Sequence, residues 1–142
     1  MNNALSFEDY LAENNCLTYA NVGVSMLPLL RQGKDLFTVR KKGPERCGVG
    51  DVVLYRRGDQ YVLHRVVQVR EKDYVILGDN CVAREYGITD EDILGIMTGF
   101  VRGGKEFGVS GVGYRLYSAF WLRTERPRVF LKRGVAWLRR HL

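Results

Sequence analysis

The feature that most constrains the fold is a succession of short segments rich in Val, Ile, Leu and Tyr, separated by turn residues, between Leu17 and Val109. Such segments are typical of β-strands, because branched and aromatic side chains suit a pleated, half-buried surface. The sequence therefore predicts a mainly β body, with strands at 17–22, 36–40, 51–57, 61–69, 73–77 and 93–102.

The clearest local structure is a hairpin whose strands, 51–57 and 61–69, flank the turn residues Gly58 and Asp59. Side chains alternate between the two faces of a strand. His64 is therefore expected to share its face with Val62 and Val66.

Both ends of the chain have helical patterns. Ser6 resembles an N-cap followed by an acidic first turn, which predicts a short helix at 6–14. After a glycine-rich hinge at Gly103-Gly104, apolar residues recur with helical spacing among arginines, which predicts a basic amphipathic helical tail. The apolar positions of the tail are Leu131, Val135, Leu138 and Leu142. We predict a domain at 1–110 and this tail at 111–142.

Composition narrows the setting in which the chain works. Of the 22 basic residues, eight lie between 114 and 142, where Glu125 is the only acid, so the net charge of +6 belongs to the tail. The sequence has no visible secretory signal, no apolar run long enough for a transmembrane helix, and three widely spaced cysteines. We expect a cytoplasmic protein, with peripheral contact at the inner membrane surface as an alternative for the tail.

A serine stands in a tight turn in Gly23-Val24-Ser25-Met26-Leu27-Pro28. A turn of this kind exposes the hydroxyl and lets the backbone N–H of Ser25 face an oxyanion. Most serines in turns have only a structural role, so the turn alone does not identify Ser25 as a nucleophile.

Those segments are Gly50-Asp51-Val52-Val53, His64-Arg65-Val66-Val67, Gly78-Asp79-Asn80 and Ile93-Leu94-Gly95, in that order after the serine turn. The ordered set, over about residues 18–102, resembles the signal peptidase and LexA-like serine peptidase superfamily. The resemblance implies a β-barrel-like sheet domain in which Ser25 is the nucleophile, and contacts of Gly23, Met26 and Pro28 with substrate. It implies no cofactor and no metal.

The base position of the superfamily is a lysine or a histidine, and here it is His64. The resemblance is therefore to the histidine branch, which includes archaeal and endoplasmic-reticulum signal peptidases. A neutral imidazole accepts a proton near neutral pH, as this role requires. The alternative for His64 is a histidine of the apolar core.

A histidine base needs a partner for its second ring nitrogen. Asp79 matches the aspartate of the family's Gly-Asp-Asn turn, and Glu85 stands where the histidine branch has a second acid, although that acid is usually Asp. The residues alone leave the choice between them open, and Asp79 could equally cap its own turn.

Two departures from the family bear on function. Gly23 stands where some bacterial signal peptidases have a hydroxyl side chain, so backbone N–H groups would have to stabilise the oxyanion. The family's membrane anchor is not visible either, and the tail is the candidate for a contact with anionic membrane. The alternative is a helical face packed on the domain or on a second copy; nucleic acid is not expected, because no base-reading motif occurs.

The predicted function is a serine endopeptidase that cleaves a leader or signal-like peptide through an acyl-enzyme, with a peptide or protein substrate. The alternative is a non-catalytic peptide- or protein-binding module on the same fold. A self-cleaving repressor-type module fits less well, because no Ala-Gly or Cys-Gly bond precedes Ser25. The oligomeric state does not follow from the sequence.

Overall fold

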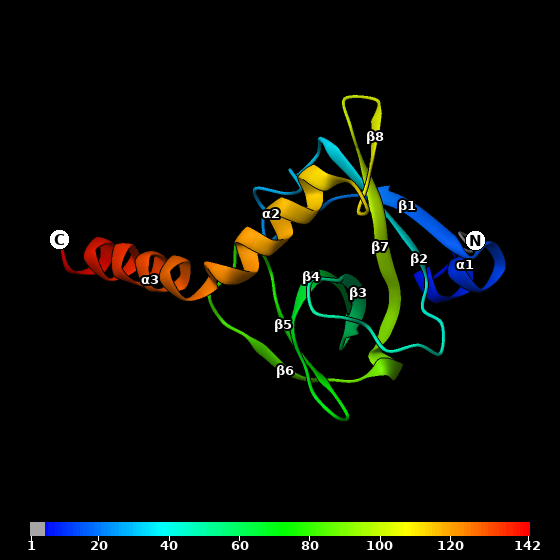
Figure 1. Cartoon of the computed structure of the whole chain (residues 1–142), viewed down its shortest axis with the longest axis horizontal. Coiled ribbons are helices and arrows are strands. Elements are labelled where there is room, and N and C mark those ends of the chain that lie inside the picture. Colours follow the sequence, from blue (N-terminus) through cyan, green and yellow to red (C-terminus); the bar gives the residue numbers. More distant parts are fainter. Residues whose placement is uncertain (1–4) are drawn as a thin grey trace.

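The structure is a computed structural model that describes residues 5–142. It is mainly β, with one antiparallel sheet of eight strands, a short helix at the N-terminal end and two helices at the C-terminal end (Figure 1). The predicted mainly β class with terminal helices is confirmed at this level.

The strands run in the order β1-β2-β7-β3-β4-β5-β6, and β8 pairs with β7. Their bounds are β1 Cys16–Ala20, β2 Asp35–Lys41, β3 Val52–Arg57, β4 Gln60–Val69, β5 Tyr74–Leu77, β6 Glu85–Ile88, β7 Ile93–Arg102 and β8 Lys105–Gly108. All six predicted strands are present, and none of their ends differs from the prediction by more than two residues. A single turn of 3₁₀ helix, Asp90–Asp92, precedes β7.

Two short strands, β6 and β8, were not predicted. Each has four residues and includes a glycine, so neither has the apolar run by which a strand is recognised. The predicted hinge at Gly103-Gly104 is wrong. Both glycines have positive φ, 57° and 78°, and they form the tight turn of the β7–β8 hairpin.

Strand β3 lies in the middle of the sheet and is buried on both faces. Val52 and Leu54 belong to one apolar cluster, while Val53 and Tyr55 belong to another on the opposite face. Burial on both faces explains why this segment reads as an uninterrupted apolar run.

The N-terminal helix α1 (Phe7–Asn14) begins and ends as the sequence predicts. The Ser6 side chain accepts a hydrogen bond from the Asp9 N–H, and Asn15 ends the helix in a left-handed conformation. Leu11 anchors the helix in the first apolar cluster.

The C-terminal tail forms two helices, α2 (Val112–Arg123) and α3 (Glu125–His141). Helix α2 crosses the domain, and α3 extends away from it, so that the C-terminus lies far from the sheet (Figure 1). Within residues 5–142, no helix combines the length and apolar character that crossing a bilayer requires.

Candidate active site

The predicted nucleophile lies in the connection between β1 and β2, on a turn held by the loop that follows β5. The carbonyl of Ser25 accepts a hydrogen bond from the Asn80 N–H at 2.8 Å, and the Asn80 side chain donates to the Val24 carbonyl at 3.0 Å. The Ser25 side chain is half-buried. Neither its hydroxyl nor its backbone N–H has a hydrogen-bond partner among residues 5–142, so both are available to a substrate.

The predicted base, His64, lies on β4 and lines the same cleft as Ser25. This cleft has a volume of about 630 Å³. Its walls come from the segment after β1, the β3–β4 hairpin, and the segment from the end of β5 to the start of β6. The lining residues are Asn21, Val22, Ser25, Arg57, Gln60, Tyr61, Val62, Leu63, His64, Asn80, Cys81, Val82, Ala83 and Glu85.

The hydrogen-bond partners around His64 favour one tautomer of the ring. The Tyr55 hydroxyl donates to Glu85 Oε1 at 2.7 Å and lies 3.3 Å from His64 Nδ1. Because the tyrosine proton is directed to the carboxylate, its oxygen accepts from Nδ1–H. The neutral ring therefore leaves Nε2 unprotonated, as a general base requires.

Burial disfavours the charged form of this imidazole. Burial lowers the pKa of His64 below its ordinary value of about 6.5; Glu85 acts to raise it, and Arg57 acts to lower it. Burial, together with the hydrogen bond to Glu85, also raises the pKa of Tyr55, so the phenol keeps its proton. The series of hydrogen bonds from His64 passes through Tyr55 to Glu85 and continues to Arg57, which donates to Glu85 at 2.9 Å.

Ser25 and His64 meet at Gly78. A side chain at Gly78 would place its Cβ 2.8 Å from the Ser25 carbonyl oxygen and 2.9 Å from His64 Cδ2, the ring atom next to Nε2. Glycine is required there because both groups approach the backbone too closely for a Cβ. Within the described chain no hydrogen bond joins Ser25 to His64, although both line one cleft.

The second predicted carboxylate, Asp79, has other partners. It forms two hydrogen bonds with Arg65, Nε to Oδ1 at 2.8 Å and Nη2 to Oδ2 at 2.9 Å, and it accepts a third from Tyr117 at 2.8 Å. Arg65 and Asp79 are both almost completely buried. Burial alone would lower the pKa of Arg65, but the hydrogen bonds and charge of Asp79 raise it. Among the hydrogen bonds of residues 5–142, the Asp79 carboxylate has none to the His64 ring and none to the backbone of its own turn.

The three residues expected to contact substrate lie around the Ser25 turn rather than in the cleft wall. Met26 is buried in the first apolar cluster, where its sulfur accepts from the Asp79 N–H at 3.4 Å. Gly23 has φ of 82°, a conformation that favours glycine, and Pro28 lines a separate apolar pocket beside Phe107. Within the described chain, the lining of the cleft includes none of the three.

One cleft wall is an unpaired strand edge. Strand β4 pairs with β3 from Gln60 to Arg65, but its pairing with β5 begins only at Arg65. Among residues 5–142, no strand pairs with the second edge of Gln60–His64, and that stretch lines the cleft. An extended peptide could add to such an edge.

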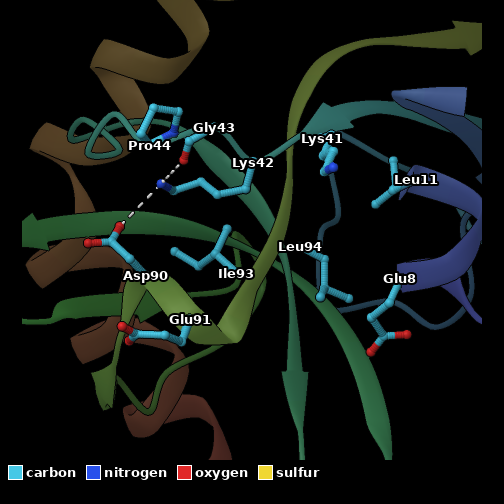
Figure 2. Close-up of a pocket in the computed structure, with 10 residues that line it drawn as sticks. All are labelled: Glu8, Leu11, Lys41, Lys42, Gly43, Pro44, Asp90, Glu91, Ile93 and Leu94. Carbon is cyan, nitrogen blue, oxygen red and sulfur yellow. Dashed lines mark hydrogen bonds and ion pairs between the residues drawn. The ribbon is translucent and has the colours of Figure 1, made fainter. Parts of the chain in front are cut away.

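A second pocket, of about 410 Å³, lies between α1, the end of β2 and the 3₁₀ turn (Figure 2). Its buried cation, Lys42, donates to the carbonyls of Gly43 and Glu45 and pairs with Asp90 at 3.4 Å. These partners satisfy the ammonium group, so Lys42 stabilises the loop after β2 and is not free to act on a ligand.

Several residues of the site were not predicted from the sequence. Tyr55 could have been found, because the two-residue Gly58-Asp59 turn sets the hairpin register and places Tyr55 diagonally opposite His64 on the same face. Tyr117, whose hydroxyl reaches Asp79, comes from α2, and no local signal predicts where that helix packs.

Comparison with known proteins adds no family. A scan against protein-family models gave no match, and a search of curated proteins gave none either.

Proposed function

We propose that this protein is a serine endopeptidase with a signal peptidase and LexA-like domain, in which Ser25 is the nucleophile and His64 the base. The observation that carries the proposal is the hydrogen-bond chain from His64 through Tyr55 to Glu85. It gives a neutral imidazole with Nε2 unprotonated, in the cleft that also contains Ser25.

The chemistry would proceed in two stages. His64 Nε2 takes the Ser25 hydroxyl proton while Oγ bonds to the peptide carbonyl carbon; the proton then passes to the leaving amine as the C–N bond breaks. Water hydrolyses the acyl-enzyme with the same base. The Ser25 N–H would donate to the oxyanion, since Gly23 supplies no hydroxyl.

The two carboxylates would have different roles. Glu85, through Tyr55, fixes the orientation of His64 and stabilises the imidazolium. Asp79 would act indirectly. It binds Arg65, and the next residue in its loop, Asn80, hydrogen-bonds to the backbone of the Ser25 turn. We therefore infer that Asp79 positions the nucleophile rather than the base.

The substrate class follows from the shape of the cleft. A peptide in extended conformation would lie along the free edge of Gln60–His64 and hydrogen-bond to its backbone. The carbonyl to be attacked would lie between Ser25 and His64, and its arrival would have to bring the two side chains into hydrogen-bond distance. Catalytic pairs are often looser without substrate.

A fluorophosphonate probe tests the enzyme directly, because it labels only activated serines. We expect labelling of the full chain that is lost in Ser25→Ala and His64→Gln and kept in Ser110→Ala, a matched change at an exposed serine outside the cleft. Peptides with small residues before the cut then report hydrolysis.

Absence of labelling in the folded protein, together with peptide binding, would favour the non-catalytic module. This alternative is supported by one observation: no hydrogen bond joins Ser25 to His64 among residues 5–142. The self-cleaving module predicts a loss of mass on incubation, and we expect the mass to stay unchanged.

A further inference from the structure

Helix α3 exposes a continuous apolar face. At 100° per residue its large apolar side chains fall on one side of the helix. All are exposed to solvent, with Phe130 at 76% and Leu142, just after the helix, at 97%; the set is Phe130, Leu131, Val135, Trp137, Leu138 and Leu142. Soluble surfaces rarely gather so many large apolar groups without a partner.

The opposite side of α3 attaches the helix to the loop beside the cleft. Arg128 donates to the Asp79 carbonyl, Lys132 to Asn80 and Arg133 to the Val82 carbonyl. Asn80 and Val82 both line the cleft. The apolar face therefore points away from the domain, while the cleft lies near the side of the helix that faces the domain.

The charges of α3 select the kind of partner. The helix carries six basic residues and a single acid, Glu125, which pairs with Arg84 at 2.7 Å. The basic residues Arg126, Arg128, Lys132, Arg133, Arg139 and Arg140 lie beside or opposite the apolar face. An exposed Trp137 stacked on His141 adds an aromatic pair of the type that suits a lipid–water interface.

We propose that α3 binds the surface of an anionic lipid bilayer, with its apolar face inserted between the headgroups, and so holds the Ser25–His64 cleft beside the membrane. An in-plane helix of this kind needs both apolar burial and attraction to anionic lipid, and α3 supplies both. A second copy would cover the apolar faces but bring like charges together. Nucleic acid would match the charge but leave the apolar face in water.

Vesicle flotation of the full chain tests the proposal independently of catalysis. We expect the protein to float with vesicles of phosphatidylcholine and phosphatidylglycerol, less with phosphatidylcholine alone, and less again as salt is raised. The Trp137 fluorescence should shift to the blue on binding. Ser25→Ala should bind like the unmodified chain, so failure of the peptidase proposal would not affect this result.

Paired variants separate the two contributions. The double variant Leu131→Asp with Leu138→Asp should weaken vesicle binding about tenfold or more, because it places charge in the apolar face. Arg139→Gln with Arg140→Gln should weaken it about tenfold. The matched control, Arg40→Gln with Lys41→Gln, removes the same charge from exposed positions of β2 and should bind normally.

Three results would overturn the proposal. One is vesicle binding that does not depend on the apolar face, seen either as equal binding by the leucine variant and the unmodified chain or as no binding to anionic vesicles at all. A second is a dimer in light scattering that the leucine variant dissociates. The third is tight binding of duplex DNA that depends on the arginines but not on the leucines, which would assign the helix to nucleic acid.

Discussion

Strand β4 directs two adjacent side chains, His64 and Arg65, to opposite faces of the sheet. Each belongs to a hydrogen-bond network, but the Arg65 network is buried and the His64 network reaches solvent. On the Arg65 face, the Arg65 guanidinium and the Asp79 carboxylate are each about 1% exposed, and two parallel hydrogen bonds join them. On the His64 face, the chain through Tyr55 and Glu85 ends at Arg57, which is half exposed.

The difference indicates a division of labour. A buried, fully bonded ion pair has no room to change protonation without a large loss of stability, so the Arg65 network holds the fold around the Ser25 turn. A histidine whose partners extend to solvent can gain and lose a proton at modest cost, as the proposed role of His64 requires. Substitutions on the Arg65 face should therefore mainly lower the free energy of unfolding. Substitutions on the His64 face should mainly change activity and its pH profile.

The largest effect is expected from Asp79→Asn. Removing the charge leaves Arg65 buried without its counter-ion, and breaking such a pair costs about 3–5 kcal/mol of the free energy of unfolding. Urea unfolding followed by circular dichroism measures it. Asp73→Asn, at an exposed pair with Arg70, is the matched control and should change stability little. Equal losses in the two variants would contradict the assignment of Asp79 to the structural face.

Tyr55→Phe should chiefly affect activity. It removes the acceptor for His64 Nδ1–H, so the tautomer is no longer fixed, and kcat/KM for a peptide should fall by about 10- to 100-fold, equivalent to about 1–3 kcal/mol. The pH profile should also shift, because the imidazolium loses a stabilising contact. Tyr86→Phe, at an exposed position of β6, should leave both unchanged. A Tyr55→Phe enzyme with normal kcat/KM and pH profile would remove Tyr55 from the site.

The pH dependence of stability should reveal His64 as well. Its pKa is lower in the folded protein than the unfolded value of about 6.5, so below that pH the unfolded chain binds more protons. The His64 contribution is therefore present above pH 6.5 and is lost as pH falls through the folded pKa. Unfolding of His64→Gln at a series of pH values should lack this slope, whereas a His141→Gln control should keep it.

The sequence predicts the two networks unequally. The Gly58-Asp59 turn fixes the β3–β4 register, and strand alternation separates His64 from Arg65, so the hairpin and its two faces follow from local rules. The N-terminal helix follows from local rules as well, whereas the roles of Ser25 and His64 rest on the family resemblance.

The partners of these residues do not follow from local rules. Glu85 belongs to β6, a four-residue strand that contains Gly87 and has no recognisable pattern. The pairing of Asp79 with Arg65 and Tyr117 depends on how the loop after β5 meets α2, which is a matter of tertiary packing. The family resemblance nominates both carboxylates but does not assign them to different faces.

The smallest expected effect is a shift in the acidic limb of the pH–activity profile in Arg57→Gln. Arg57 lowers the pKa of His64 through its charge, although burial is the larger cause. Removing a half-exposed cation should raise the His64 pKa slightly, and the rise in kcat/KM with pH should move to a higher pH by a few tenths of a unit. High salt should diminish the difference, since it screens Arg57.

The matched control for that shift is Arg56→Gln, whose side chain pairs with Glu8 rather than Glu85. It removes the same charge from the neighbouring position of β3 and should leave the profile in place. A shift of equal size in both variants would mean that the net charge of the hairpin, and not the chain from His64 to Glu85, sets the proton affinity of the base. A shift in Arg57→Gln alone would show that an exposed residue, Arg57, influences the proton affinity of His64 through the hydrogen-bond network. The Arg65 network is buried and has no such exposed end.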